Sequence, residues 1–200
     1  MNIGPYSYEE YLRLVKAFHG RLDPGLMIGG FMVDLALKNL PEGEVFGAIS
    51  ETPVCLPDAI QLLTSCTIGN GRLTVLDLGR FAAILYERDT GQGVRVFLDP
   101  ARLDEWPAIE DWFLKRKRYH EIDHQVLIRE IKEAGHRTMG IGYIHVEPSR
   151  LRRRRIGPVA LCPDCGEAYP AQDGIRCRGC QAGKHPEGSN GTIRNVSSWS

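Results

Sequence analysis

Four cysteines in the last quarter of the chain have the spacing of a metal site. Cys162 and Cys165 form one C-x2-C pair, and Cys177 and Cys180 form a second pair after an interval of eleven residues. Two intervening residues let both thiolates of a pair turn toward one centre, and two pairs complete a tetrahedral zinc site. Four cysteine ligands leave no open position, so the pattern predicts one structural Zn2+ per chain. The alternatives are two disulfides or a C-x-x-C redox pair.

The segment around these cysteines depends on the metal for its fold. Leu161 to Lys184 is far too short to bury a hydrophobic core of its own. We therefore expect a zinc finger over about residues 160–184, within a C-terminal region, 150–200, that also holds a basic linker and a polar tail.

A second group of potential metal ligands lies in the first 70 residues: His19, Asp23, Cys55, Asp58 and Cys66. Cys55 and Cys66 bracket a predicted helix of about nine residues, which separates their Cα atoms by roughly 14 Å. One metal therefore cannot take both from the same chain, and either one cysteine is a ligand or the second comes from a partner subunit. The candidates for this possible second site are His19, Cys55 and Cys66.

Each of these residues also has an explanation without a metal. Asp23 followed by Pro24 is a helix N-cap, and His19 at a helix C-terminus is favoured by the helix dipole. Cys66 fits a buried small hydrophobe. A helix N-terminus next to Cys55 would lower the pKa of its thiol, so a reactive thiolate is the rival functional interpretation. His120 and His124 are interpreted as surface residues, because no H-E-x-x-H pattern accompanies them.

The elements that must position these residues alternate between helices and strands. Ser7 and Glu10 form a capping box before one helix, and Asp23-Pro24 opens a second, buried helix that Pro41 ends. Further helices are predicted over 57–65, 102–118 and 120–134, and strands over 44–51, 73–76, 81–87, 94–98 and 140–146. Adjacent strands joined by tight turns favour an α+β core domain over residues 1–149, with a largely antiparallel sheet and packed helices.

The charge is divided between these two regions, although the whole chain is neutral. Residues 1–149 carry 16 Lys+Arg against 21 Asp+Glu, a balance of −5, and residues 150–200 carry 9 against 4, a balance of +5. The basic run at Arg150 and 152–155 would let only this last quarter contact nucleic acid. The alternative is a solvated linker, or one that docks on the acidic core.

No apolar run approaches the roughly 20 residues that cross a bilayer, so we expect no membrane association. The N-terminal residues lack a basic segment followed by an apolar stretch, which favours a cytoplasmic protein with reduced cysteines.

Three stretches of the core resemble the formylmethanofuran dehydrogenase E-subunit family. Residues 18–25 read FHGRLDPG, residues 51–69 read ETPVCLPDAIQLLTSCTIG, and residues 91–95 read GQGVR. The family shows F-H-G-H-x-x-P-G, a Cys followed by D-A-I-Q-x-L-T-G-C-T-x-G, and a hairpin with G-x-G-V-R. The resemblance covers roughly residues 7–147, and some members also carry a C-terminal treble-clef zinc finger, which matches Cys162–Cys180.

This resemblance implies an α+β core, a tightly intertwined homodimer and a metal-handling role for His19 and Cys55. The family is named for genes beside a molybdenum or tungsten formylmethanofuran dehydrogenase of methanogenesis, so an accessory role to such an oxidoreductase is implied. Whether the protein is an enzyme using His19 and Cys55, or a nucleic-acid-binding or metal-sensing regulator acting through the finger, stays open. Arg21 stands where the family has its second His, and Ser65 replaces a Gly.

Overall fold

The computed structural model describes residues 1–40, 46–147 and 157–183. The chain divides into two compact units, Met1–Arg152 and Arg153–Ser200, and each is described by itself. The arginine run at 150–155 lies outside the described residues, as does the polar tail.

The first unit is built on a five-stranded sheet with the order β4-β3-β5-β6-β7. The strands are β3 (Phe46–Ser50), β4 (Leu73–Val75), β5 (Ala82–Glu87), β6 (Gln92–Leu98) and β7 (Met139–His145). All neighbouring pairs are antiparallel except β3 and β4, which run parallel. The predicted α+β fold with a largely antiparallel sheet is therefore confirmed.

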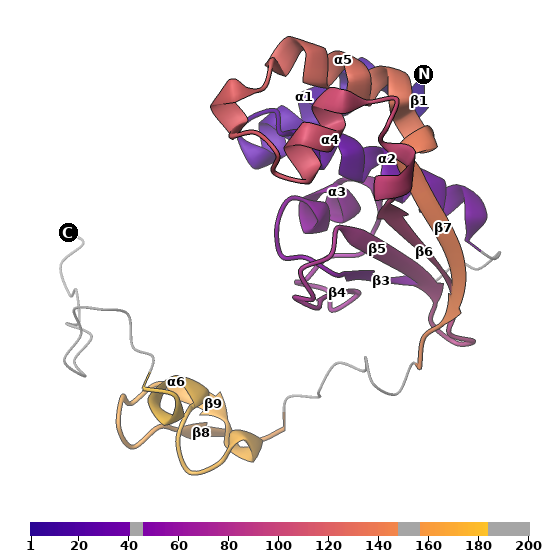
Figure 1. Cartoon of the computed structure of the whole chain (residues 1–200). Coiled ribbons are helices and arrows are strands. Elements are labelled where there is room, and N and C mark those ends of the chain that lie inside the picture. Colours follow the sequence, from indigo (N-terminus) through magenta and orange to yellow (C-terminus); the bar gives the residue numbers. More distant parts are fainter. Residues whose placement is uncertain (41–45, 148–156, 184–200) are drawn as a thin grey trace. The chain divides into compact units, whose positions relative to one another are not determined.

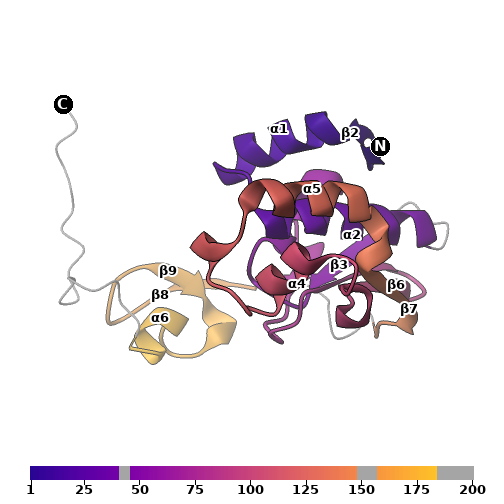
Figure 2. The same ribbon diagram turned by 45° about the horizontal axis from the view of Figure 1, so that its top comes forward.

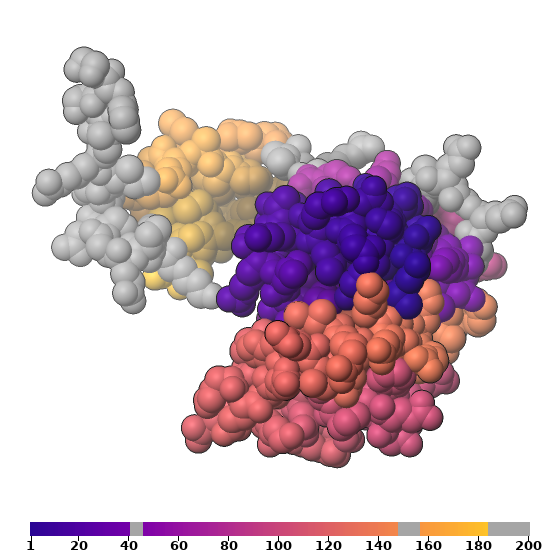
Figure 3. Space-filling model, turned by 90° about the horizontal axis from the view of Figure 1, so that it is seen from above, coloured from indigo at the N-terminus to yellow at the C-terminus, as the bar shows by residue number. Residues whose placement is uncertain are grey.

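Helices cover one face of this sheet in two layers (Figures 1 and 2). The inner layer holds α2 (Pro24–Asn39), which packs on β5 and β6, and α3 (Leu56–Leu63), which packs on α2. The outer layer holds α1 (Tyr8–His19), α4 (Pro107–Phe113) and α5 (His124–Ala134). Figure 3 shows its surface, where the N-terminal segment lies beside the segment that carries α5, and Lys132 of α5 pairs with Glu9 of α1 at 2.9 Å.

Local sequence signals set the helix ends that matter for the site. Ser7 and Glu10 form the predicted capping box, and α1 ends at Gly20, whose φ is 86°. The Asp23 carboxylate caps α2 by accepting a hydrogen bond from the Gly25 N–H at 2.9 Å. The end of α1 and the start of α2 are therefore close in the sequence, which keeps His19 and Asp23 near each other.

Two glycines of α2 let α3 approach unusually closely. A Cβ on Gly25 would lie 3.0 Å from both Cβ and Sγ of Cys55, and one on Gly29 would lie 2.9 Å from Cβ of Ala59. These glycines are four residues apart and so lie on the same face of α2. The sequence thus brings the first turn of α3, with Cys55 before it, against the first turn of α2.

The structure corrects two predicted helices. The stretch 102–118 is not one helix: a 3-10 turn spans Pro100–Arg102, and α4 begins only at Pro107, because proline lacks the N–H that a helix interior needs. The helix predicted over 120–134 begins after Asp123, whose carboxylate accepts from the N–H groups of Gln125 and Val126. The five predicted strands all occur, with ends within two residues of the prediction.

A short N-terminal hairpin was not predicted: β1 (Asn2–Ile3) pairs with β2 (Tyr6–Ser7). The second unit contains the hairpin of β8 (Val159–Leu161) and β9 (Ala168–Pro170), followed by a 3-10 turn, Ala171–Asp173, and the short helix α6 (Arg178–Gln181). Within the described ranges, no helix combines the length and the hydrophobicity that crossing a membrane requires.

Candidate metal centres

The four cysteines of the second unit converge on one point. Sγ of Cys162 lies 3.6 Å from Sγ of Cys180, and Sγ of Cys165 lies 3.8 Å from Sγ of Cys177. A tetrahedral zinc ion with Zn–S bonds of about 2.3 Å holds its sulfurs about 3.8 Å apart, whereas a disulfide needs about 2.05 Å. All six cysteines of the chain are free. The geometry therefore fits zinc and excludes the two disulfides.

Backbone N–H groups point at these sulfurs, as in a thiolate site. The N–H of Cys177 donates to Sγ of Cys162 at 3.5 Å, and the N–H of Cys180 donates to Sγ of Cys177 at 3.4 Å. The N–H groups of Cys177 and Cys165 lower the pKa of the Cys162 thiol to about 6. Backbone N–H donors of this kind stabilise the thiolate of Cys162, the form that binds a metal, whereas desolvation and the neighbouring cysteines raise the pKa of the Cys180 thiol.

In the first unit, His19, Asp23 and Cys55 form a second cluster. Their candidate ligand atoms all lie within 4.8 Å of one another, and each side chain is half-buried. His19 is the last residue of α1, Asp23 caps α2, and Cys55 precedes α3. A zinc ion with bonds of about 2.0–2.3 Å would hold the three atoms about 3.3–3.8 Å apart, and Sγ of Cys55 already lies 3.3 Å from Oδ1 of Asp23.

Asp58 orients the histidine of this cluster. Its Oδ2 lies 2.8 Å from Nδ1 of His19, and it belongs to the first turn of α3. A carboxylate that accepts the Nδ1 proton fixes the ring and leaves Nε2 with a lone pair. This is the arrangement that metal-binding histidines commonly have.

The backbone at Cys55 is strained. Its φ of 58° and ψ of −51° place it in a γ-turn, closed by a 2.6 Å hydrogen bond from the Leu56 N–H to the Val54 carbonyl. Such a conformation costs about 1–3 kcal/mol for a residue other than glycine, and strain of this size concentrates at functional sites. The turn holds Sγ of Cys55 3.3 Å from Oδ1 of Asp23, to which the thiol donates.

The thiol of Cys55 is not activated by its position before α3. Burial and the carboxylates of Asp23 and Asp58 raise its pKa to about 12. This direction is opposite to the lowered pKa expected from the helix N-terminus, and it argues against a reactive thiolate in the metal-free site.

The structure separates Cys66 from this cluster. Cys66 is fully buried in the hydrophobic core, and its thiol donates to the Phe46 carbonyl at 3.4 Å. Asp23, which the sequence explains as a helix cap, lies in the cluster instead. Its position before Pro24 gives the capping signal, but nothing local indicates that Cys55 will lie beside it.

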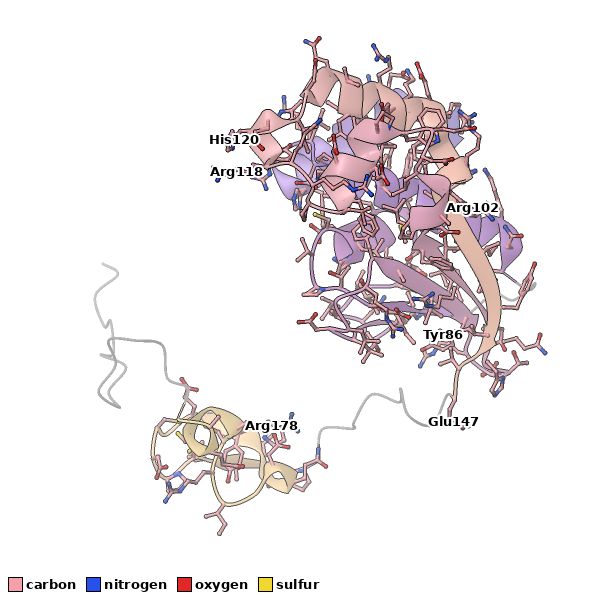
Figure 4. The ribbon with its side chains drawn as sticks, viewed as in Figure 1. Tyr86, Arg102, Arg118, His120, Glu147 and Arg178 are labelled. Atoms are coloured by element: carbon pink, nitrogen blue, oxygen red, sulfur yellow. The ribbon has the colours of Figure 1, made fainter. Side chains whose placement is uncertain are left out.

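Arg21 borders the cluster, whereas His120 and His124 do not belong to it. Arg21, at the position of the family's second His, is exposed, and its guanidinium is 3.7 Å from Oδ2 of Asp23. His120 and His124 are exposed, as predicted, and Figure 4 shows His120 at an outer corner of the helical layer.

A pocket of about 460 Å³ opens beside Cys55. Its walls are formed by Gly25 in the first turn of α2, the γ-turn at Cys55, the adjoining ends of β5 and β6, and the C-terminal end of α4. Its lining includes the side chains of Cys55, Arg80, Phe81, Arg95, Trp112 and Lys115. Sequence reasoning did not find this pocket, although Arg95 and Cys55 belong to two of the stretches that carry the family resemblance.

Comparison with known families identifies both units. A family model described as FmdE, molybdenum formylmethanofuran dehydrogenase operon, matches residues 18–141, and the FmdE treble clef zinc finger model matches residues 153–186. The chain belongs to the FmdE family. The cysteine cluster of this FmdE chain is accordingly the zinc site of a treble-clef finger, and the predicted resemblance is confirmed.

Known relatives extend this assignment. The crystal structure of a tungsten formylmethanofuran dehydrogenase E-subunit (FmdE)-like protein from Syntrophus aciditrophicus is 53% identical, with a TM-score of 0.84, and the match covers 91% of this chain and 96% of that one. A probable S-adenosyl-L-methionine-binding protein from Archaeoglobus fulgidus is 31% identical, and the match covers 82% of this chain and 51% of that protein. The FmdE chain thus spans about half the length of this curated relative.

Proposed function

We propose that this FmdE protein is a dimeric, two-metal accessory of a molybdenum or tungsten oxidoreductase, with its second metal in the core domain. The observation that carries the proposal is the convergence of His19, Asp23 and Cys55 from three separate element ends. One nitrogen, one oxygen and one sulfur ligand suit a borderline divalent ion such as Zn2+.

The donor set is typical of a catalytic or ligand-binding metal site and not of a structural one. Three protein ligands leave at least one position for a water or a bound molecule, unlike the four cysteines of the finger. A divalent ion there would supply a Lewis acid. The protein's own part is positional: Asp58 orients His19, the γ-turn holds the Cys55 sulfur, and Asp23 is fixed by its bond to the Gly25 N–H.

The support for the accessory role comes from the family to which the chain belongs. The raised pKa of the Cys55 thiol argues against a free thiolate nucleophile at this site when no metal is bound. The relative from Syntrophus aciditrophicus is named for the tungsten enzyme. An enzyme that uses His19 and Cys55 is the second candidate, favoured because three protein ligands would leave a position of a bound metal open and because a pocket opens beside Cys55.

Metal analysis tests the core site. The zinc-loaded full chain should contain two metals, and His19→Ala or Cys55→Ala should contain one. Cys66→Ala is the matched control, since Cys66 is a buried cysteine outside the cluster, and it should retain two. One metal in the wild-type chain, or two in both cluster variants, would refute the core site.

The dimer and the partner are tested separately from the metal. Sedimentation equilibrium should give twice the mass of the 22.4 kDa chain. Gentle isolation of the tagged protein from its native host should recover subunits of a molybdenum or tungsten enzyme. Recovery of the protein without any oxidoreductase subunit would count against the accessory role.

Nucleic-acid binding through the finger is the remaining alternative. Among the described residues of the finger, Arg176 pairs with Asp164 and Arg178 with Asp173, both at 3.0 Å, so these two arginines are already engaged. A true phosphate-binding surface would make affinity fall by about 0.9 log units per log unit of salt for each contact. Duplex DNA or RNA that fails to shift on gels at low salt would exclude this alternative.

A further inference from the structure

The pocket beside Cys55 has an aromatic wall. Phe81, Trp112 and Phe113 pack on one another with ring centroids 6.3–6.4 Å apart, and the indole and the Phe81 ring meet edge to face. All three rings line the pocket, which has a volume typical of small-molecule sites. Aromatic walls of this kind favour a ligand with a planar, apolar ring system, because flat rings bury large areas against each other.

The same pocket carries an excess of positive charge. Arg95 binds the nearly buried Glu51 through two bonds of 2.8 Å, and Arg80 binds the same carboxylate at 2.9 Å. One carboxylate cannot neutralise two guanidinium groups, so this cluster keeps one net positive charge. Arg80 is 59% exposed and Arg95 is 25% exposed, so a ligand can reach both.

Lys115, which follows α4, adds a second positive charge to the pocket lining. Its ammonium lies 5.1 Å from the centroid of the Trp112 ring, and within the described part of the chain it forms no salt bridge. Lys115 has a φ of 55°, and it and Cys55 are the two non-glycine residues with positive φ in the described ranges. Both line the same pocket, and residues held in such conformations concentrate at binding sites.

We propose that this pocket binds a small aromatic anion. The ring lies against Trp112 and Phe81, and the anionic group, a carboxylate, sulfonate or phosphate, lies between Arg80 and Lys115. Cys55 lines the same cavity, so the bound molecule lies next to the proposed core metal; only this last statement rests on the proposed function. The binding of the anion itself depends on the rings and cations alone.

A matched pair of fluorescent probes tests the proposal on the full-length, zinc-loaded chain. 8-Anilino-1-naphthalenesulfonate is an aromatic anion, and N-phenyl-1-naphthylamine has the same rings without the sulfonate. We expect one anionic probe per chain, bound at least tenfold more tightly than the neutral probe. Equal affinity for the two probes would overturn the charge assignment.

Variants locate the site. Arg80→Gln and Lys115→Gln should each weaken the anionic probe about tenfold and leave the neutral probe unchanged, whereas Trp112→Leu should weaken both. Arg102→Gln is the matched control, because this exposed arginine lies in the 3-10 turn outside the pocket lining (Figure 4). Unchanged affinity in both Arg80→Gln and Lys115→Gln would place the probe elsewhere and overturn the proposal.

Metal content separates this inference from the proposed metal site. Arg80→Gln should keep two metals per chain while losing probe affinity, and Cys55→Ala should lose one metal while still binding the anionic probe. Loss of probe binding in Cys55→Ala with retained circular dichroism would show that the metal, and not the rings and cations, holds the anion, and would refute the pocket as described.

Discussion

Replacing Cys55 by glycine or alanine tests whether its backbone is strained. Both substitutions remove the sulfur and with it the proposed core metal, so the two variants differ only in the side-chain methyl group. At an ordinary loop position alanine is the more stable, by about 0.4–1 kcal/mol, because glycine has more conformational freedom in the unfolded chain. At Cys55 we expect the opposite order.

The magnitude follows from the conformation. A φ of 58° with a ψ of −51° costs a residue with a Cβ about 1–3 kcal/mol, and glycine avoids this cost. Subtracting glycine's disadvantage of about 0.4–1 kcal/mol leaves the Cys55→Gly variant more stable than Cys55→Ala by roughly 1 kcal/mol. The difference is small relative to total stability, but it has the opposite sign to the usual one.

Urea denaturation of the two full-length variants, each loaded with one equivalent of zinc for the finger, measures this difference. Circular dichroism and tryptophan fluorescence follow unfolding, and equal m-values would show that the unfolded states are comparable. Val54→Gly and Val54→Ala form the control pair, since Val54 is exposed and lacks a positive φ; there alanine should be the more stable. If Cys55→Ala is also more stable than Cys55→Gly, the γ-turn is not strained and the reasoning fails.

Three further predictions concern the metal sites and the pocket. Removing zinc with a chelator should abolish hydrogen-exchange protection in the β8–β9 hairpin, because the finger lacks a hydrophobic core of its own. The protection of β5 and β6 should stay intact, and loss of protection in both units would contradict this prediction. Gly25→Ala should displace Cys55, because the new Cβ would lie 3.0 Å from its Sγ. The free energy of unfolding should fall by about 1–3 kcal/mol, and one bound metal should be lost. Gly69→Ala, at an exposed glycine without such a close contact, should have neither effect. The Arg95 guanidinium lowers the pKa of the Glu51 carboxyl below its usual 4.5, so this stabilisation is present above pH 4.5 and disappears as pH falls through the lowered pKa. Glu51→Gln should therefore destabilise the protein at about pH 7 but much less at about pH 3 in urea titrations, and an equal loss at both would be inconsistent with the ion pair.

Most of the fold is predictable because its signals are local. The capping box at Ser7 and the Asp23-Pro24 start appear in the structure as the sequence indicates. The five strands also follow from their apolar runs and turns. The helix predicted over 102–118 is wrong because it makes Pro107 an interior residue, although this proline marks a helix start.

The sequence alone is enough to identify the four zinc ligands of the finger. Its four ligands lie within nineteen consecutive positions, 162–180, and the two C-x2-C pairs carry both the ligand identity and the local geometry. The sulfur separations of 3.6 and 3.8 Å agree with the site that the spacing predicts, because no long-range packing is needed to bring these ligands together.

Only the tertiary structure decided the composition of the core cluster and the existence of the pocket. Asp23 and Cys55 are 32 residues apart, and they meet because Gly25 and Gly29 let α3 pack closely on α2. The spacing excluded a single-chain site with both Cys55 and Cys66, but it could not show that Asp23 would join His19 and Cys55. The pocket needs β5, β6 and α4 together, and which side chains share such a space depends on how separate elements pack, which no local pattern encodes.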